Sequence, residues 1–307
     1  NLSRGISMST AIIFPSDVFD TSRPHSMWEA EVKVASDLGQ VYLLDFEALL
    51  EGNVRRAIRK MPAGDGSSII YHGWMMVPSV YETFYQGLKD KGYELINNPK
   101  EYLGCHHIAN WYPVIQEFTP KTVIVHSDNV REILDAARTF GDSSIIIKDF
   151  VSSQKHNWKE ACFIPSGNDV INATRVIATF VAMQKEVDGD QGGIVLREFV
   201  PLRSIGVHPK SGMPISQEFR AFILNGKRIS VSKYWEYGEY AEDEPSYSLI
   251  SKVADKVSKK LWSKFFTVDL AQKENGEWIC IEVGDGQVSS LPELGNKKEF
   301  YSRLMGK

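Results

Sequence analysis

Two acidic residues near the end of the chain face each other if the segment around Asn275-Gly276 forms a β-hairpin. Asn-Gly between strand-like segments is the strongest short-range hairpin signal, because a type I′ turn needs positive φ at both central residues. Extending the pairing outward from a two-residue loop places Asp269 directly opposite Glu282. Like charges opposite each other destabilise a sheet, so a cation between them is the expected compensation. Oxygen ligands with no nearby His or Cys favour Mg²⁺ or Mn²⁺ over zinc.

The surroundings of this acidic pair leave two interpretations open. The neighbouring positions on the other sheet face are apolar and suited to a core: Val268, Leu270, Ile281 and Val283. Glycines flank Asp285 and let the backbone turn closely beside a ligand, which makes this residue a third candidate metal ligand. The alternatives are a solvated face on which Asp269 and Glu282 avoid each other, and an ordinary turn at Asp285. A register shift of one residue would separate the acidic pair.

A second Asn-Gly turn predicts a cluster of opposite charges. If Asn225-Gly226 forms a two-residue loop, Glu218 lies opposite Lys233. Arg220 then shares their face of the sheet by the period-two rule. Three charged side chains on one face need either solvent or a charged ligand. An ordinary cross-strand ion pair on a hydrated surface is therefore the alternative to a ligand site.

The first part of the chain alternates strand-like and helix-like segments. Apolar runs predict strands over residues 11–14, 41–44, 68–71 and 122–125. Helices are expected over 26–38 and in the segments that end at Gly92 and Gly141, with Ser79 and Asp128 as the N-caps of the last two. Strands alternating with helices imply an α/β layer with a largely parallel sheet.

The pattern changes near residue 142. A strand over 145–148 is followed by a polar loop, a helix over 169–185 and a strand over 194–200, before the two hairpins. This arrangement is typical of an α+β unit with antiparallel sheets. We expect a cloning remnant, an N-terminal domain and a second domain over residues 1–7, 8–141 and 142–307, respectively.

The composition is that of a globular protein. The 307 residues include 35 Lys and Arg, 39 Asp and Glu and 43% hydrophobic residues, with a net charge of −4, which argues against disorder, collagen and coiled coil. No apolar run reaches the roughly 18 residues of a transmembrane helix, so we expect no membrane association. The mildly acidic total argues against broad nucleic-acid binding. Three scattered cysteines fit a reducing compartment, so we expect a cytoplasmic protein.

Several common catalytic motifs are missing from the sequence. There is no Gly-x-x-x-x-Gly-Lys-Ser/Thr phosphate loop, no Gly-x-Gly-x-x-Gly after a strand and no Gly-x-Ser-x-Gly nucleophile turn. Cys105-His106-His107 could suggest a metal site, but no second ligand pair stands nearby, and packing is the preferred interpretation. Tyr102 and Trp111 are expected in a core or between domains rather than in a base-stacking platform.

The motifs of the second half together resemble the ATP-grasp superfamily. In chain order they are Ile147-Lys148-Asp149, Lys155-His156-Asn157-Trp158, residues 195–200, Glu218-Phe219-Arg220-Ala221-Phe222, Thr267-Val268-Asp269 and residues 281–287. More narrowly, they resemble the clade that contains the eukaryotic initiation factor 2 assembly chaperone and uncharacterised bacterial and phage proteins. The resemblance implies an α/β N-terminal (pre-ATP-grasp) domain followed by an α+β ATP-grasp fold. Two subdomains, of about residues 142–195 and 196–307, would clamp the nucleotide.

The resemblance also implies roles for individual residues. Lys148, at a strand end, and Lys155 would hold ATP phosphates, and Glu198-Phe199-Val200 would be the hinge that meets the adenine edge. Arg220 and Lys233 would neutralise the γ-phosphate and the charge that develops on it. The remaining implied nucleotide contacts are Arg197 and Glu218, and the implied magnesium carboxylates are Asp269, Glu282 and Asp285.

The position of Asp285 departs from the family pattern. Many ATP-grasp enzymes carry Asn two positions after the metal-binding Glu, where this chain has Gly284. The neighbouring Asp285 is the candidate substitute, and a second metal ion depends on it.

The activity implied by the resemblance is that of an ATP- and Mg²⁺-dependent ligase. Such an enzyme phosphorylates a carboxylate to an acyl phosphate that an amine attacks, and a peptide or protein is a candidate acceptor. The acceptor would lie between the N-terminal domain and the nucleotide cleft, where Arg23, His72 and Trp74 are candidate contacts. One alternative is an ATP-binding assembly factor without ligase turnover. A nucleic-acid end-joining ligase ranks last, because the Lys-x-Asp-Gly motif of nucleotidyl ligases is absent.

Overall fold

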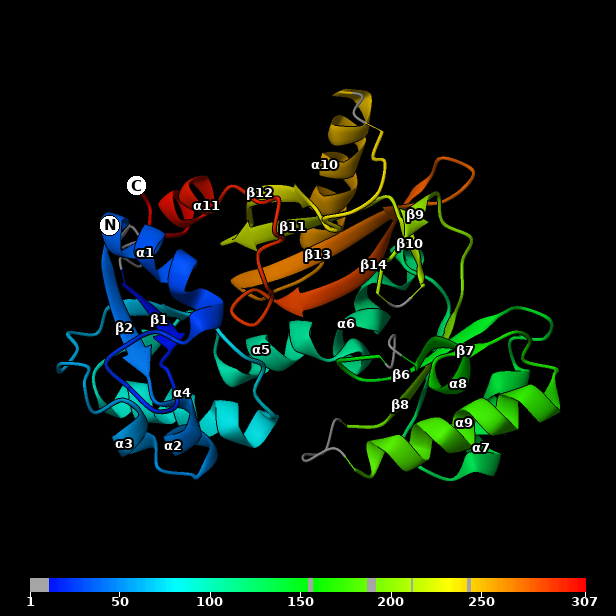
Figure 1. The fold of residues 1–307 in the computed structure, drawn as a ribbon, viewed down its shortest axis with the longest axis horizontal. Coiled ribbons are helices and arrows are strands. Elements are labelled where there is room, and N and C mark those ends of the chain that lie inside the picture. Colours follow the sequence, from blue (N-terminus) through cyan, green and yellow to red (C-terminus); the bar gives the residue numbers. More distant parts are fainter. Residues whose placement is uncertain (1–10, 154–156, 187–191, 211, 242–243) are drawn as a thin grey trace, which may run out of the picture.

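Four parallel strands form the N-terminal sheet, in the order β2-β1-β3-β4. The computed structural model describes residues 11–153, 157–186, 192–210, 212–241 and 244–307, and Figure 1 shows their arrangement. The strands of this sheet are β1 (Ala11–Pro15), β2 (Gln40–Leu44), β3 (Ser68–Tyr71) and β4 (Glu94–Leu95). The parallel α/β layer predicted from the first three strands is therefore confirmed.

Helices cover both faces of this sheet. They are η1 (Ser26–Trp28), α1 (Glu29–Leu38), α2 (Phe46–Leu50), α3 (Val54–Ala57) and α4 (Pro78–Asp90). The N-cap prediction for α4 is wrong, because the helix begins one residue earlier, at Pro78, with Val77 in the cap position. Proline suits this first helical position, since its φ is already helical and its missing N–H has no partner there anyway.

A second sheet lies at the far end of the molecule and has the strand order β5-β8-β6-β7. Its strands are β5 (Thr122–Val125), β6 (Ile145–Asp149), β7 (Phe163–Ile164) and β8 (Ile194–Glu198). Helices α7 (Val130–Arg138), α8 (Trp158–Ala161) and α9 (Val170–Gln184) accompany it. All its strand pairs are antiparallel. We call this part the distal lobe.

The distal lobe corrects one prediction about the N-terminal domain. The strand at 122–125 was expected in the parallel sheet, but β5 pairs with β8 instead. The helix after it, α7, packs through Ile133 and Ala137 into the core beneath β6 and β8. Residue 142 therefore does not separate two sheets. The N-cap of α7 is Asn129 rather than the expected Asp128, because the Asn129 Oδ1 accepts the N–H of Arg131 at 2.9 Å.

A third, antiparallel sheet occupies the centre of the molecule, in the order β12-β11-β13-β14. It contains β11 (Glu218–Leu224), β12 (Lys227–Lys233), β13 (Phe265–Gln272) and β14 (Trp278–Asp285). A small hairpin of β9 (Ser204–Val207) and β10 (Pro214–Ser216) precedes it. Helices α5 (Pro99–His106), α6 (Ile108–Ile115) and α10 (Glu244–Ser258) complete this region, with η2 (Gln116–Phe118) after α6.

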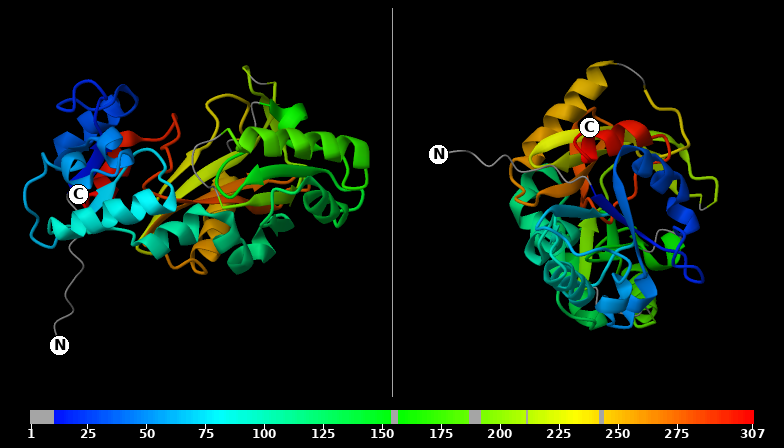
Figure 2. Two further views of the ribbon diagram at one scale, coloured as in Figure 1. Left: turned by 90° about the horizontal axis from the view of Figure 1, so that it is seen from below. Right: turned by 90° about the vertical axis from the view of Figure 1, so that its left-hand side faces the viewer.

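The central sheet buries one face against α5, α6 and α10. This core contains Trp111 of α6, Ile250 of α10 and Phe219 of β11, all fully buried. Near the other end of the sheet, the C-terminal helix α11 (Lys297–Leu304) joins Phe222 and the N-terminal helix α1 in a separate core. Figure 2 shows this red helix against the blue N-terminal domain, with the green helices of the distal lobe at the opposite end.

None of the helices in the described segments is both long and apolar enough to cross a membrane.

Candidate functional site

The first Asn-Gly turn forms as predicted, but the register beyond it differs. Asn225 and Gly226 have φ of 48° and 73°, as a type I′ turn requires. A bulge in β12 after the first pairs then shifts the register by one residue. Lys233 consequently lies opposite Phe219, and the predicted register, in which it lies opposite Glu218, is wrong.

The shift separates Lys233 from Arg220. Residues opposite each other in an antiparallel pair share a face, so Lys233 lies on the face of Phe219, which belongs to the core against α10. The Lys233 ammonium lies 5.2 Å from the centroid of the Tyr240 ring. Arg220 lies opposite Ser232 on the other face. The expectation that Arg220 and Lys233 act together on one phosphate is therefore corrected.

The second Asn-Gly segment gives the predicted acidic pair by a different route. Lys273 and Glu277 close a three-residue loop, in which Gly276 has a φ of 88°. This loop alone would misalign the strands by one residue, but a bulge between the pairs of Leu270 and Asp269 restores the register. Asp269 therefore faces Glu282, as predicted.

The same bulge changes which residues form the core face of β14. Cys280 pairs with Leu270 and is fully buried in the central core. Ile281, which was expected in that core, is the additional residue of the bulge and lines a cavity on the other face. The predicted core positions of Val268 and Val283 are confirmed.

A cavity of about 410 Å³ lies between the central sheet and the distal lobe. Its wall carries seven charged side chains, namely Lys148, Arg197, Glu198, Glu218, Arg220, Asp269 and Glu282. Residues from β6, β8, β11, β13 and β14 thus converge on one space, although they are up to 134 positions apart in the sequence. Lys155 lies outside the described residues.

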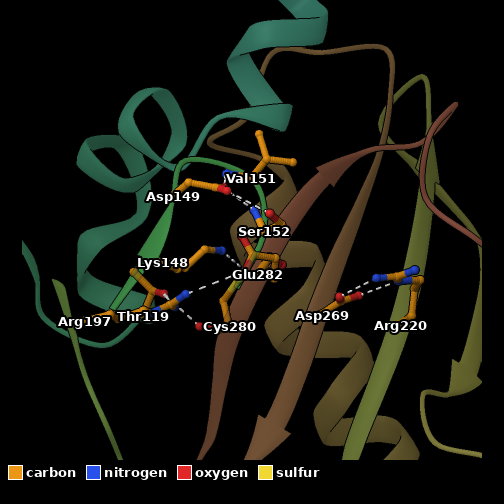
Figure 3. Close-up of polar contacts among 10 residues, drawn as sticks. All are labelled: Thr119, Lys148, Asp149, Val151, Ser152, Arg197, Arg220, Asp269, Cys280 and Glu282. Carbon is orange, nitrogen blue, oxygen red and sulfur yellow. Dashed lines mark hydrogen bonds and ion pairs between the residues drawn. The ribbon is translucent and has the colours of Figure 1, made fainter. Parts of the chain in front are cut away.

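Two ion pairs connect the cations and carboxylates of this wall, as Figure 3 shows. The Lys148 Nζ donates to the Glu282 Oε2 at 2.9 Å, from the end of β6 to β14. Arg220 donates to both oxygens of Asp269, from Nε at 2.8 Å and from Nη2 at 2.7 Å. Bidentate pairs of this kind are stronger and more directional than single ones. The acidic pair is thus compensated by two basic side chains.

The electrostatics of Arg220 follow from this pairing. Burial alone would lower its pKa, but the charge and hydrogen bonds of Asp269 outweigh burial, so the pKa of Arg220 is raised. Its guanidinium also lies 4.9 Å from the Tyr234 ring centroid and donates from Nη1 to the Ser290 carbonyl at 2.9 Å. Arg220 is therefore a fully charged group held in one orientation at the cavity wall.

Arg197 adds a third cation behind the Lys148–Glu282 pair. Its Nη1 lies 4.0 Å from the Glu282 Oε2, and its Nη2 donates to the Thr119 hydroxyl at 2.5 Å. Burial lowers the pKa of this guanidinium from its usual value, and Glu282 opposes that effect. The carboxylate of Glu282 is thus approached by two basic groups.

The loop after Lys148 is organised by Asp149, which was not predicted as a site residue. Its Oδ1 accepts the N–H groups of Val151 at 2.7 Å and Ser152 at 2.5 Å, and its Oδ2 accepts the Ser152 hydroxyl at 2.8 Å. An Asp that bonds the backbone two residues ahead forms a compact turn. This turn places Val151, Ser152 and Ser153 in the cavity wall.

The predicted hinge lies at the opposite end of the cavity. The backbone N–H of Glu198 donates to Lys121 O and that of Phe199 to Ser144 O, each at 2.9 Å. In the described part of the chain, the N–H of Val200 has no protein acceptor, and Pro201 after it has none to offer. Val200 is therefore the hinge residue whose N–H is available to a ligand.

Apolar and aromatic side chains surround the hinge, and most of them were not predicted as site residues. They are Trp158, Met213, Ile215, Tyr234 and Trp235, together with the predicted Phe199. The Trp158 ring stacks on Phe163 and meets Phe199 at an angle of 65°. The aromatic residues after Lys233 were detectable in the sequence, but nothing there indicated that β9 and β10 would bring Met213 and Ile215 to the same cavity.

Asp285, the third predicted metal ligand, does not reach this cavity. It is fully buried on the other face of β14, where its carboxylate accepts Asn97 Nδ2 at 2.5 Å and the Gln287 N–H at 2.9 Å. Gln287 in turn donates to the Tyr81 hydroxyl at 2.7 Å. Asp285 thus joins the central sheet to the N-terminal domain. Within the described segments, no three His, Cys, Asp or Glu side chains form a metal-binding group.

The buried position of Asp285 predicts a pH dependence of stability. Burial raises its pKa from 3.8 to about 7, although the hydrogen bonds of Asn97 and Gln287 oppose this effect. The folded state therefore holds a proton that the unfolded state has released, so the free energy of unfolding should fall as pH rises from about 4 to about 7, by an amount on the order of 4 kcal/mol. Urea unfolding at a series of pH values measures this slope. Asp285→Asn should lose this part of it, and an unchanged slope in that variant would contradict the assignment.

The expected acceptor contacts are not brought together. His72 is buried, with its Nδ1 3.0 Å from the hydroxyl of Tyr301 on α11. Trp74 packs edge-on against Trp28, and Arg23 is exposed. None of the three lines the cavity.

The other aromatic and histidine predictions are confirmed as packing. Tyr102 and Trp111 are fully buried in two different cores. Cys105, His106 and His107 are also buried. Burial, His107 and Lys148 lower the pKa of His106 to about 3, so this imidazole is neutral.

A comparison with protein families matches residues 139–304 to an ATP-grasp domain family, the third family of its clade. This chain belongs to that family. The matched region covers more than half of the chain and contains every charged residue of the cavity wall. A search of the curated proteins finds no match.

Solved structures agree with this fold. The ATP-grasp ligase PsnB, complexed with a phosphomimetic variant of its minimal precursor, Mg and ADP, is similar over 100% of this chain and 98% of its own, with 9% identity and a TM-score of 0.56. N5-carboxyaminoimidazole synthase from Aspergillus clavatus is similar over 97% and 77%, with 8% identity and a TM-score of 0.59. Cdc123 from Schizosaccharomyces pombe matches over 61% and 85%, with 18% identity, but its TM-score of 0.43 adds nothing to the fold assignment.

Proposed function

We propose that the cavity binds ATP, with the adenine at the hinge and the phosphates between Lys148 and Arg220. The observation that supports this most directly is the arrangement of the wall, which is apolar and aromatic at the hinge and charged at the other end. The Val200 N–H would donate to the adenine N1. A guanine base carries a donor at that position, so we expect ATP to bind in preference to GTP.

The acidic pair fits a divalent cation that accompanies the nucleotide. Asp269 and Glu282 face each other across β13 and β14, and both line the cavity. Carboxylate oxygens are the ligands that Mg²⁺ and Mn²⁺ prefer. We therefore propose Asp269 and Glu282 as the metal carboxylates, without Asp285. A bound cation would neutralise phosphate charge in the site.

For the reaction, we propose that the protein is a ligase that joins a carboxylate to an amine. ATP would transfer its γ-phosphoryl group to the carboxylate, giving an acyl phosphate and ADP, and the amine would then displace phosphate. Arg220 would stabilise the charge on the transferred group, with no covalent bond to the protein. Family membership supports this class of reaction. One solved PsnB complex contains the precursor peptide PsnA2, which makes a peptide or protein a candidate acceptor here.

The compartment is proposed from the cysteines. All three are free and buried, and burial raises the pKa of the Cys105 and Cys280 thiols, which makes them unreactive. This pattern fits a reducing environment, and we propose a cytoplasmic location.

The test measures ATP binding first and turnover second. ATP with Mg²⁺ should raise the midpoint of thermal unfolding, and pools of peptides, amino acids and other amines and carboxylates should then be screened for release of ADP and phosphate. Asp269→Asn should abolish that release. The absence of any thermal shift would refute the proposal. A shift without ADP from any acceptor would instead favour an ATP-binding assembly factor.

A further inference from the structure

The charged end of the cavity carries more negative than positive side chains. Among the described residues, its wall holds three basic groups, Lys148, Arg197 and Arg220, and four carboxylates, Glu198, Glu218, Asp269 and Glu282. The formal charge of this set is therefore −1. A free nucleotide polyphosphate, which is strongly negative, would enter a site that does not offer a surplus of positive charge.

The two cations proposed for the phosphates are also engaged by the two carboxylates proposed for the metal. Lys148 is buried and donates to Glu282, while both terminal bonds of the Arg220 fork go to Asp269. Figure 3 shows these pairs side by side in the same wall. A phosphate group that approached Lys148 or Arg220 would have to compete with a carboxylate already bound there.

We propose that Asp269 and Glu282 form an electrostatic gate that admits a nucleotide only together with a divalent cation. This inference rests on the proposed function and specifies the ligand as a cation–nucleotide complex. The complex offers a partner to each member of both ion pairs: its cation meets the carboxylates, and its phosphates meet Lys148 and Arg220. A metal-free nucleotide satisfies only the basic side chains and leaves two carboxylates unpaired beside negative phosphates. Because such coupling is reciprocal, the nucleotide also raises the affinity for the cation.

The two pairs should open with different ease. The Glu282 side chain is 29% exposed and receives a single short bond from Lys148, whereas Asp269 is 6% exposed and both of its oxygens are bound. The cation should therefore engage Glu282 first. Glu282 should consequently dominate the selection against free nucleotide.

The experiment measures the binding of a non-hydrolysable ATP analogue by calorimetry, with either Mg²⁺ or EDTA present. For the wild-type protein, we expect Mg²⁺ to tighten binding at least about tenfold. Glu282→Gln releases Lys148 and should bind the metal-free analogue more tightly than the wild type, by about tenfold. The same variant should gain little from Mg²⁺. Asp269→Asn should show the same change to a smaller extent.

Two control variants separate the gate from a general effect of charge. Glu218→Gln removes a carboxylate from the cavity wall that lies outside the two ion pairs, and it accepts a hydrogen bond from Ser216. Glu277→Gln removes an exposed carboxylate of the same hairpin, which pairs with Lys273 outside the cavity. Neither change should abolish the advantage of Mg²⁺.

The outcomes distinguish this inference from the function on which it rests. Equal binding of the analogue with Mg²⁺ and with EDTA would overturn the gate and leave the ATP site intact. Equal gains in metal-free binding for Glu218→Gln and Glu282→Gln would also overturn it, because cavity charge alone would then explain the effect. No binding in either condition would overturn the proposed function itself.

Discussion

An Arg220→Met variant is expected to turn over ATP roughly 100- to 1,000-fold more slowly than the wild-type protein, with a much smaller loss of nucleotide affinity. Arg220 is fixed by Asp269, Tyr234 and the Ser290 carbonyl, so its charge is already oriented when substrate binds. A group that is held in place before the reaction stabilises developing charge without a cost of reorganisation. Steady-state release of ADP, measured with an acceptor from the screen, gives the rate, and calorimetry with the non-hydrolysable analogue gives the affinity.

Arg228→Met is the matched control for this experiment. It removes a guanidinium that pairs with Asp255 on the same sheet but outside the ATP cavity. The two variants therefore lose the same chemical group and an ion pair each. Because unpaired Asp269 is buried and destabilising, both proteins must be assayed below their unfolding midpoints. Equal losses of rate in the two variants would contradict the role of Arg220.

Asn97→Ala is expected to lower the free energy of unfolding by roughly 3 to 5 kcal/mol. Asn97 is fully buried between the N-terminal domain and the central sheet. Its Nδ2 donates to Phe265 O at 2.7 Å and to Asp285, and its Oδ1 accepts the Phe265 N–H at 3.0 Å. Alanine would leave three buried polar groups without partners, and each of them costs about 1 to 3 kcal/mol. Urea unfolding measures the loss.

The exposed N-cap of α7 provides the comparison. Asn129→Ala also removes an Asn side chain that bonds the backbone, but it should cost only about 1 kcal/mol. A loss in Asn97→Ala no larger than that in Asn129→Ala would mean that the junction between the N-terminal domain and the central sheet does not depend on this side chain.

The sequence was sufficient for the strands and for the acidic pair. Short apolar runs and Asn-Gly turns depend on local physics, so β1, β2 and β3 and both hairpins could be predicted. The register beyond each turn could not, because a bulge is a choice made by packing on the whole sheet. This is why the position of Lys233 was wrong, while that of Asp269 was right only because two irregularities compensate.

Long-range partners were the other limit. The pairing of β5 with β8 joins positions about 70 residues apart, and local periodicity carries no information about it. Asp285 had the sequence surroundings of a ligand, but the alternation of side chains along β14 directs it to Asn97 instead. The ion pairs of Lys148 and Arg220 were likewise invisible, since sequence reasoning assigned each of these charges to a ligand.

The bulge in β14 places a constraint on how this hairpin can vary. The loop at 274–276 is one residue longer than the predicted turn, and Ile281 is one residue more than an unbroken strand needs. These two additions act as a frame shift and its suppressor. An insertion or deletion in the loop alone would move Glu282 away from Asp269, so loop length and bulge are expected to change together as relatives diverge.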